Sequence, residues 1–125
     1  MQKVIIQNLG PIKECEIDLK PFTVFIGESG TGKSAILKTV SLLKWIYKKM
    51  QYKVLLKHSK VKSDALRFRL KGLLENSMLD NFVTKDTYID FLEDNTSLIA
   101  IENNKLNPKY DNIKTDIFWS VKLFF

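Results

Sequence analysis

A glycine-rich stretch in the first third of the chain has the residue types and spacing of a phosphate-binding loop. It runs from Gly27 to Ser34 as G-E-S-G-T-G-K-S and matches the pattern G-x-x-x-x-G-K-[ST] at every fixed position. Gly30 and Gly32 keep side chains out of the loop, so that backbone N–H groups can converge on phosphate oxygens at the positive end of a following helix. Lys33 is expected to reach the β- and γ-phosphates, and Ser34 to be a ligand of Mg²⁺. The predicted ligand is therefore a magnesium-bound nucleoside triphosphate.

The residues around this loop support the same interpretation. An apolar run from Phe22 to Ile26 is typical of a strand that enters the loop, and a helical pattern follows it. A chance glycine-rich turn is the alternative, but it does not require this order of strand, loop and helix. Lys33 is also the predicted catalytic residue. The predicted nucleotide-binding residues are Gly27, Glu28, Ser29, Gly30, Thr31, Gly32, Lys33, Ser34 and Ala35.

The elements that must position the loop can be predicted from periodicity. Val4–Ile6 and Ile17–Leu19 flank the turn signal Asn8–Pro11, which predicts two short strands. A long helix is predicted from Lys33 to the mid-fifties, because apolar residues recur there at alternating spacings of four and three. Its predicted apolar face consists of Ile36, Val40, Leu43, Tyr47, Met50 and Val54.

The second half of the chain predicts a short helix followed by strands. Ser63 or Asp64 is expected to cap a helix that ends near Asp80, with Leu66, Leu70, Leu73 and Leu74 on one face. Residues 88–92 and 97–101 read as strands joined around Asp94-Asn95, with a further turn at Asn103-Asn104. The pattern is that of an antiparallel meander.

Composition limits the chain to a few classes of protein. With 125 residues, 45% of them hydrophobic, the chain is expected to form one domain around one modest core. No stretch approaches the ~20 apolar residues of a membrane span, and no signal peptide is evident, so a cytoplasmic protein without membrane contact is expected. The single cysteine, Cys15, is interpreted as a small strand residue and not as a metal ligand. The lone histidine, His58, is interpreted as a surface residue.

Positive charge is concentrated in the middle of the chain. The net charge is +6, but residues 44–71 alone carry ten Lys and Arg against a single acid, Asp64. If the long helix continues, one basic stripe is expected to consist of Lys49, Lys53, Lys57 and Lys60. A polyanion such as nucleic acid is a possible partner there, and the alternative is a solvated lysine face. We expect no aromatic residues interleaved with the stripe, so that any binding would be through phosphates and steeply dependent on salt.

Residues 2–50 resemble the N-terminal lobe of bacterial AAA/ABC-type ATPases related to the RecF, SMC and OLD groups. The similar segments are V-I-I-Q-N-L-G-P-I at 4–12 and I-D-L-K-P-F-T-V-F-I at 17–26, which lead into the loop. The resemblance implies an α/β fold, a P-loop NTPase-type core forming part of an ABC-type lobe, with antiparallel N-terminal strands and a small β-meander. It also implies ATP with Mg²⁺ as ligands, assembly into a homodimer or a larger ATPase complex, and relatives that handle DNA ends or act in phage defence.

Several residues of the family's hydrolytic site have no counterpart in this chain. Gln2, Gln7 and Gln51 are wrongly placed for a Q-loop, and no Leu-Ser-Gly-Gly-like signature exists. Leu98–Glu102 imitates a Walker B strand but lacks its metal-binding aspartate, so a hairpin strand is the preferred interpretation. Ala35 stands where many relatives have threonine. We therefore expect one incomplete nucleotide-binding domain over 1–125, divided into 1–58, a basic helical segment 59–84 and a β-rich segment 85–125, which binds Mg-ATP with weak or no hydrolysis.

Two further functions remain open at this stage. A small P-loop phosphotransferase would need an acceptor site and an arginine-rich lid, and Arg67 and Arg69 are the only arginines. A nucleic-acid or protein interaction module could retain the loop as a relic. A GTPase is disfavoured, because no Asp-x-x-Gly motif occurs and the segment 104–107, N-K-L-N, lacks the base-reading aspartate.

Overall fold

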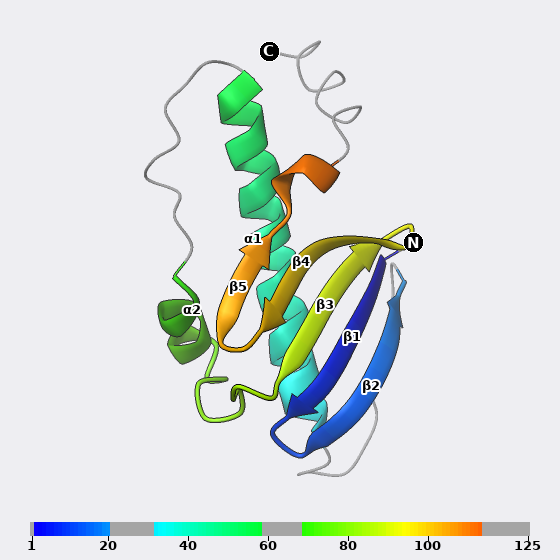
Figure 1. The fold of residues 1–125 in the computed structure, drawn as a ribbon, viewed down its shortest axis with the longest axis vertical. Coiled ribbons are helices and arrows are strands. Elements are labelled where there is room, and N and C mark those ends of the chain that lie inside the picture. The colour runs from blue at the N-terminus through cyan, green and yellow to red at the C-terminus, as the bar shows by residue number, and fades with distance from the viewer. Residues whose placement is uncertain (1, 21–31, 59–68, 114–125) are drawn as a thin grey trace.

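The computed structural model describes residues 2–20, 32–58 and 69–113 (Figure 1). Its elements are β1 (Gln2–Leu9), β2 (Ile12–Leu19), α1 (Lys33–His58), α2 (Leu70–Asn76), β3 (Tyr88–Glu93), β4 (Thr96–Glu102), β5 (Lys105–Pro108) and the 3-10 helix η1 (Tyr110–Asn112). The predicted strand at Phe22–Ile26 lies outside the described residues. Among the helices that are described, none is long and apolar enough to cross a membrane.

The five strands form one sheet in the order β2-β1-β3-β4-β5, and all of the described pairings are antiparallel. The predicted N-terminal strand pair and the predicted meander are therefore both confirmed. The sequence did not indicate that they share a sheet, which they do because β1 pairs with β3 from Gln2↔Glu93 to Gln7↔Tyr88. The described part of the fold is thus an antiparallel layer, and the parallel sheet of a P-loop core is not among its elements.

Tight turns with left-handed residues connect the strands of the meander. Asp94 and Asn95 have φ values of +51° and +65°, and Asn103 and Asn104 have φ values of +51° and +56°. Asn and Asp tolerate this conformation better than other non-glycine residues, and two such residues in succession give the turn whose twist suits a two-residue hairpin. Both turns lie where the sequence predicted them.

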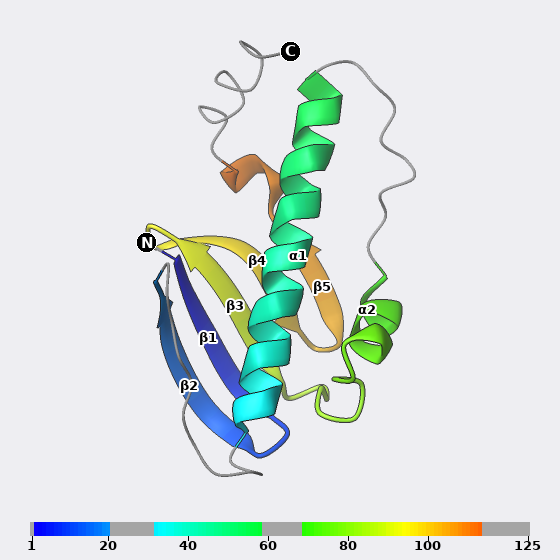
Figure 2. The same ribbon diagram turned by 180° about the vertical axis from the view of Figure 1, so that it is seen from behind.

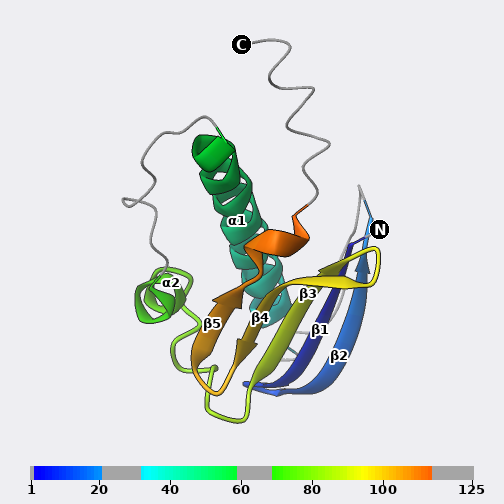
Figure 3. The same ribbon diagram turned by 45° about the horizontal axis from the view of Figure 1, so that its top comes forward.

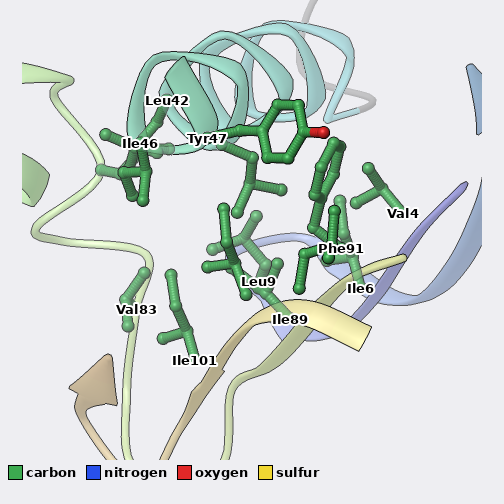
Figure 4. Close-up of a cluster of buried hydrophobic side chains, with 14 of the residues drawn as sticks. Val4, Ile6, Leu9, Leu42, Ile46, Tyr47, Val83, Ile89, Phe91 and Ile101 are labelled. Carbon is green, nitrogen blue, oxygen red and sulfur yellow. The ribbon is translucent and has the colours of Figure 1, made fainter. Parts of the chain in front are cut away.

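Helix α1 lies across one face of the sheet and supplies six of the 20 described buried residues of the core cluster (Figure 2). Leu43, Tyr47 and Met50 are buried, and the other residues of the predicted apolar face, Ile36, Val40 and Val54, are partly buried against the same cluster. Figure 4 shows Leu42, Ile46 and Tyr47 of α1 above Ile6, Ile89 and Phe91 of the sheet. Each large side chain buried in this way stabilises the fold by roughly 1.5–3 kcal/mol, so α1 is held firmly on the sheet.

Three polar or aromatic contacts also join α1 to the second half of the chain. The hydroxyl of Tyr47 donates a hydrogen bond to Glu93 Oε2 at 3.0 Å, and its ring lies 5.7 Å from that of Phe91. Lys53 Nζ lies 5.1 Å from the ring centre of Tyr110, which places η1 beside α1 (Figure 3). The helix that begins at the phosphate-binding loop is therefore fixed to the meander as well as to the N-terminal hairpin.

The second helix is shorter than predicted. Helix α2 begins at Leu70, because Arg69 has an extended backbone with φ −113° and ψ 110°, and it ends at Asn76. The proposed caps Ser63 and Asp64, and Leu66, lie outside the described residues. The prediction of an end near Asp80 is wrong, since residues 77–82 form turns in which Leu79 N–H donates to Leu74 O and Phe82 N–H donates to Leu79 O.

Candidate functional site

The described part of the phosphate-binding loop lies against the turn between β1 and β2. Gly27–Thr31 fall outside the described residues, whereas Gly32 is buried and has a φ of +93°. A Cβ on Gly32 would lie 2.7 Å from Ile12 Cγ1, so both the backbone angle and the space require glycine here. The N-terminal hairpin therefore supports the loop where it passes into α1.

Lys33 and Ser34 form the first turn of α1. Ser34 is exposed and Lys33 is half-buried. Ala35, the next residue of the helix, is buried in the core. The hydrogen bond from Ile36 N–H to Gly32 O, at 2.9 Å, starts the helix, so that the N–H groups just before it have no partner within the helix. No acidic residue lies in the first turn to oppose an anion. The ammonium, the hydroxyl and the positive helix end fit a bound Mg-triphosphate.

A polar pocket, which the sequence did not indicate, lies beside the turn between β1 and β2. Its volume is about 480 Å³, and Ile12, which contacts Gly32, is one of its walls. The other lining residues are Asn8, Gly10, Lys13, Asn81, Phe82, Thr84 and Asp86. The pocket joins residues more than 70 positions apart, so no local sequence pattern could have indicated it.

Hydrogen bonds to backbone carbonyl oxygens hold the two sides of the pocket together. Gly10 N–H donates to Phe82 O at 3.1 Å, and the Thr87 hydroxyl donates to Asn8 O at 2.6 Å. The side-chain amide of Asn8 donates through Nδ2 to the backbone oxygen of Asp86 at 3.2 Å. Thr87 is 1% exposed and also accepts from Thr84 N–H at 2.9 Å, so it orders the segment before β3. The segment 81–87 is thereby fixed to the turn that supports the loop.

Glu102 of β4 and Asp90 of β3 are placed as residues of the sheet. Leu98–Glu102 lies within β4 between β3 and β5, with its apolar residues buried and Glu102 exposed, as expected for a hairpin strand. Asp90 is 8% exposed and accepts hydrogen bonds from Ser97 Oγ at 2.5 Å and from Tyr88 OH at 3.1 Å. Because Ile89 and Phe91 point toward α1, Asp90 lies on the opposite face of the sheet. Within the described residues no group of three His, Cys, Asp or Glu side chains could hold a metal ion.

The predicted basic stripe is only partly described, and its aromatic surroundings differ from the prediction. Lys49 and Lys53 lie on α1, nothing is described of the Lys57 side chain, and Lys60 lies outside the described residues. Lys49 Nζ lies 5.6 Å from the ring centre of Trp45, and Lys53 lies over Tyr110. The expectation of no aromatic interleaving is therefore wrong. The 3.6-residue period of the helix places Trp45 and Tyr52 among the lysines, a signal that the sequence already contained.

The remaining singled-out residue, Cys15, lies in β2 opposite Ile6. It is partly buried against the core, and this burial raises the pKa of its thiol. It is a strand residue, as predicted, and its environment favours the neutral thiol.

No curated protein and no solved structure matches the chain. A family profile described as AAA ATPase domain matches residues 1–119, which is nearly the whole chain and includes both the loop and the meander. The match agrees with the loop, the helix start and the resemblance noted from the sequence: the chain belongs to the AAA ATPase domain family.

Proposed function

We propose that this chain binds Mg-ATP through Gly27–Ser34 and hydrolyses it weakly or not at all on its own. The observation that carries the proposal is the start of α1, where Gly32, Lys33 and Ser34 follow one another at the positive end of a 26-residue helix. The family supports a nucleotide-binding ATPase-type domain, and the choice of ATP and Mg²⁺ extends that support to a particular ligand.

Each residue of the helix start has a separate role in this proposal. Lys33 contributes a compact positive charge to the terminal phosphates, and Ser34 contributes its hydroxyl to the metal ion. The metal ion would neutralise charge on the phosphates. Gly32 lets the loop approach them, because its conformation and its contact with Ile12 exclude a side chain.

Weak hydrolysis follows from what surrounds the helix start. Transfer of a phosphoryl group to water requires a group that positions the water, in addition to charge neutralisation. Of the described carboxylates, Asp90 lies across the sheet from α1 and Glu102 lies at the end of a hairpin strand. Asp86 lines the pocket beside the loop, where we assign it to the base and not to the attacking water. We therefore propose that turnover depends on groups from a larger assembly, such as a second copy of the chain.

We place the sugar and base of the nucleotide in the polar pocket beside the loop. Ile12 contacts Gly32 and also lines this pocket, so one side chain lies between the pocket and the end of the loop. Asn81 and Asp86 offer an amide and a carboxylate that can hydrogen-bond to the edge of a base. If this placement is correct, Asp86→Ala changes the ratio of ATP to GTP affinity, whereas a change in both affinities by the same factor contradicts it.

The test of the proposal is calorimetric titration of Mg-ATP into the chain and its Lys33→Ala variant, with phosphate release followed in the same samples. Because charge-assisted hydrogen bonds contribute about 1.5–3 kcal/mol, the variant is expected to lose roughly 10- to 100-fold in affinity. Lys105→Ala is the matched control, since Lys105 is an exposed lysine of β5. Equal affinity of the chain and Lys33→Ala would refute the loop assignment, and turnover that depends on Lys33 would refute the claim of weak hydrolysis.

A further inference from the structure

The face of α1 that points away from the sheet exposes two aromatic rings. Trp45 is 45% exposed and Tyr52 is 51% exposed, although both are large side chains on the central helix of the fold. They are seven residues apart, which is two helical turns, so they lie on the same side of α1 at an axial separation of about 10 Å. Figure 2 shows the side of α1 that faces away from the sheet toward the viewer, with α2 next to the helix.

Lysines border this aromatic row on both sides. The sequence of α1 contains seven lysines and no aspartate or glutamate. By the period of the helix, Lys44 and Lys48 fall on one side of the row and Lys38 and Lys49 on the other. Lys49 lies over the Trp45 ring, at 5.6 Å from its centre. The face therefore combines flat apolar rings with the lysines of a helix that contains no acidic residue of its own.

A groove between α1 and α2 extends the surface next to Trp45. It has a volume of about 680 Å³ and is lined on its apolar side by Leu37, Trp45, Leu73 and Met78. Ser41 and Asn76 add polar groups to its rim. A groove with an indole wall and hydrogen-bonding groups at the edge suits a planar ring that has polar atoms on its rim.

We propose that this face of α1 binds single-stranded nucleic acid. Bases stack on Trp45 and Tyr52, one of them entering the groove, and the lysines on either side contact the phosphates. Single strands are specified because a duplex keeps its bases paired and offers the rings nothing to stack on. An acidic peptide would satisfy the lysines but would leave the two rings without a role, so nucleic acid uses more of the observed surface.

The test uses the 125-residue chain carrying Trp119→Phe, so that Trp45 is its only tryptophan. Binding of a fluorescein-labelled oligothymidylate of about 15 nucleotides, which covers the usual site sizes, is measured by polarisation, and Trp45 fluorescence is recorded in parallel. We expect binding that is tighter than that of a duplex of equal length and that quenches Trp45. Absent binding at low salt, or equal binding of both nucleic acids without quenching, overturns the proposal.

Variants separate stacking from charge. Trp45→Ala is expected to weaken oligothymidylate binding by about 5- to 150-fold, and Tyr52→Ala similarly, because each stacked base contributes roughly 1–3 kcal/mol. Trp45→Phe retains a ring and is expected to restore part of the loss, which separates stacking from misfolding. Unchanged affinity in both alanine variants overturns the proposal.

The contribution of the α1 lysines is tested by comparing the salt dependence of binding in two double variants. Lys48→Gln with Lys49→Gln removes two phosphate contacts, so the slope of log affinity against log salt is expected to become shallower by about 1.4. Lys85→Gln with Lys105→Gln removes two exposed lysines outside α1 and is expected to leave the slope unchanged. Equal slopes for the two double variants show a diffuse effect of net charge and overturn the proposed face.

Discussion

Ile12 and Gly32 touch so closely that a Cβ on Gly32 would lie 2.7 Å from Ile12 Cγ1. This contact connects the N-terminal hairpin to the start of α1, where Lys33 and Ser34 lie. The hairpin is thus the support on which the end of the phosphate-binding loop rests.

Gly32→Ala is expected to destabilise the protein and to weaken Mg-ATP binding. The substitution puts a Cβ against Ile12 and forces alanine to a φ of +93°, and strain of this kind costs about 1–3 kcal/mol. Chemical denaturation and calorimetric titration measure the two effects. Gly72→Ala is the matched control, because Gly72 lies in α2 with nothing within 4 Å of its Cβ position, and this variant is expected to be up to about 1 kcal/mol more stable. Equal stability of the two variants would contradict the contact.

Ser34→Ala is expected to reduce only the part of nucleotide binding that depends on metal. The exposed hydroxyl makes no contribution to the core, so the unfolding midpoint is expected to stay the same. Calorimetric titrations of ATP with Mg²⁺ and with EDTA are the measurement. The role as a metal ligand predicts a loss of affinity with Mg²⁺ and none with EDTA, and the same loss in both conditions would rule that role out.

Predictability from the sequence depended on how far apart the interacting residues are. The start of α1, its apolar face and the turns at Asp94-Asn95 and Asn103-Asn104 follow from local patterns, and all were predicted. The pairing of β1 with β3 and the hydrogen bond from Gly10 to Phe82 join residues more than 70 positions apart, where alternation of apolar residues specifies a face but not a partner. Trp45 and Tyr52 were missed for another reason. They lie off the predicted apolar face of α1, and the period of the helix was applied to the lysines alone, although the same period places both rings among them.

Tyr47 is expected to make stability depend on pH in the alkaline range. Desolvation, together with its hydrogen bond to Glu93, raises the pKa of Tyr47 from 10.0 to about 12. Because the folded-state pKa lies above the unfolded one, the contribution is complete below pH 10 and is lost as the pH rises from about 10 to 12. Denaturation midpoints across this range measure the loss. In Tyr47→Phe the denaturation midpoint is expected to decline less steeply with pH than in the parent chain. Tyr52→Phe, on the exposed side of α1, is the control and is expected to decline as the parent does. Equal declines in all three proteins would contradict the assignment.

Asp90 is expected to matter for stability and not for nucleotide binding. Its carboxylate accepts hydrogen bonds from Ser97 and Tyr88 and is 8% exposed, so Asp90→Ala leaves two hydroxyl groups without their acceptor and is expected to cost about 1–3 kcal/mol. Asp90→Asn keeps one carbonyl acceptor and is expected to cost less. Both variants should bind Mg-ATP as the parent does at temperatures where they are folded, because Asp90 lies across the sheet from α1. A selective loss of nucleotide affinity in a folded Asp90→Asn variant would place this carboxylate in the site, and would show that the outer face of the sheet contributes to it.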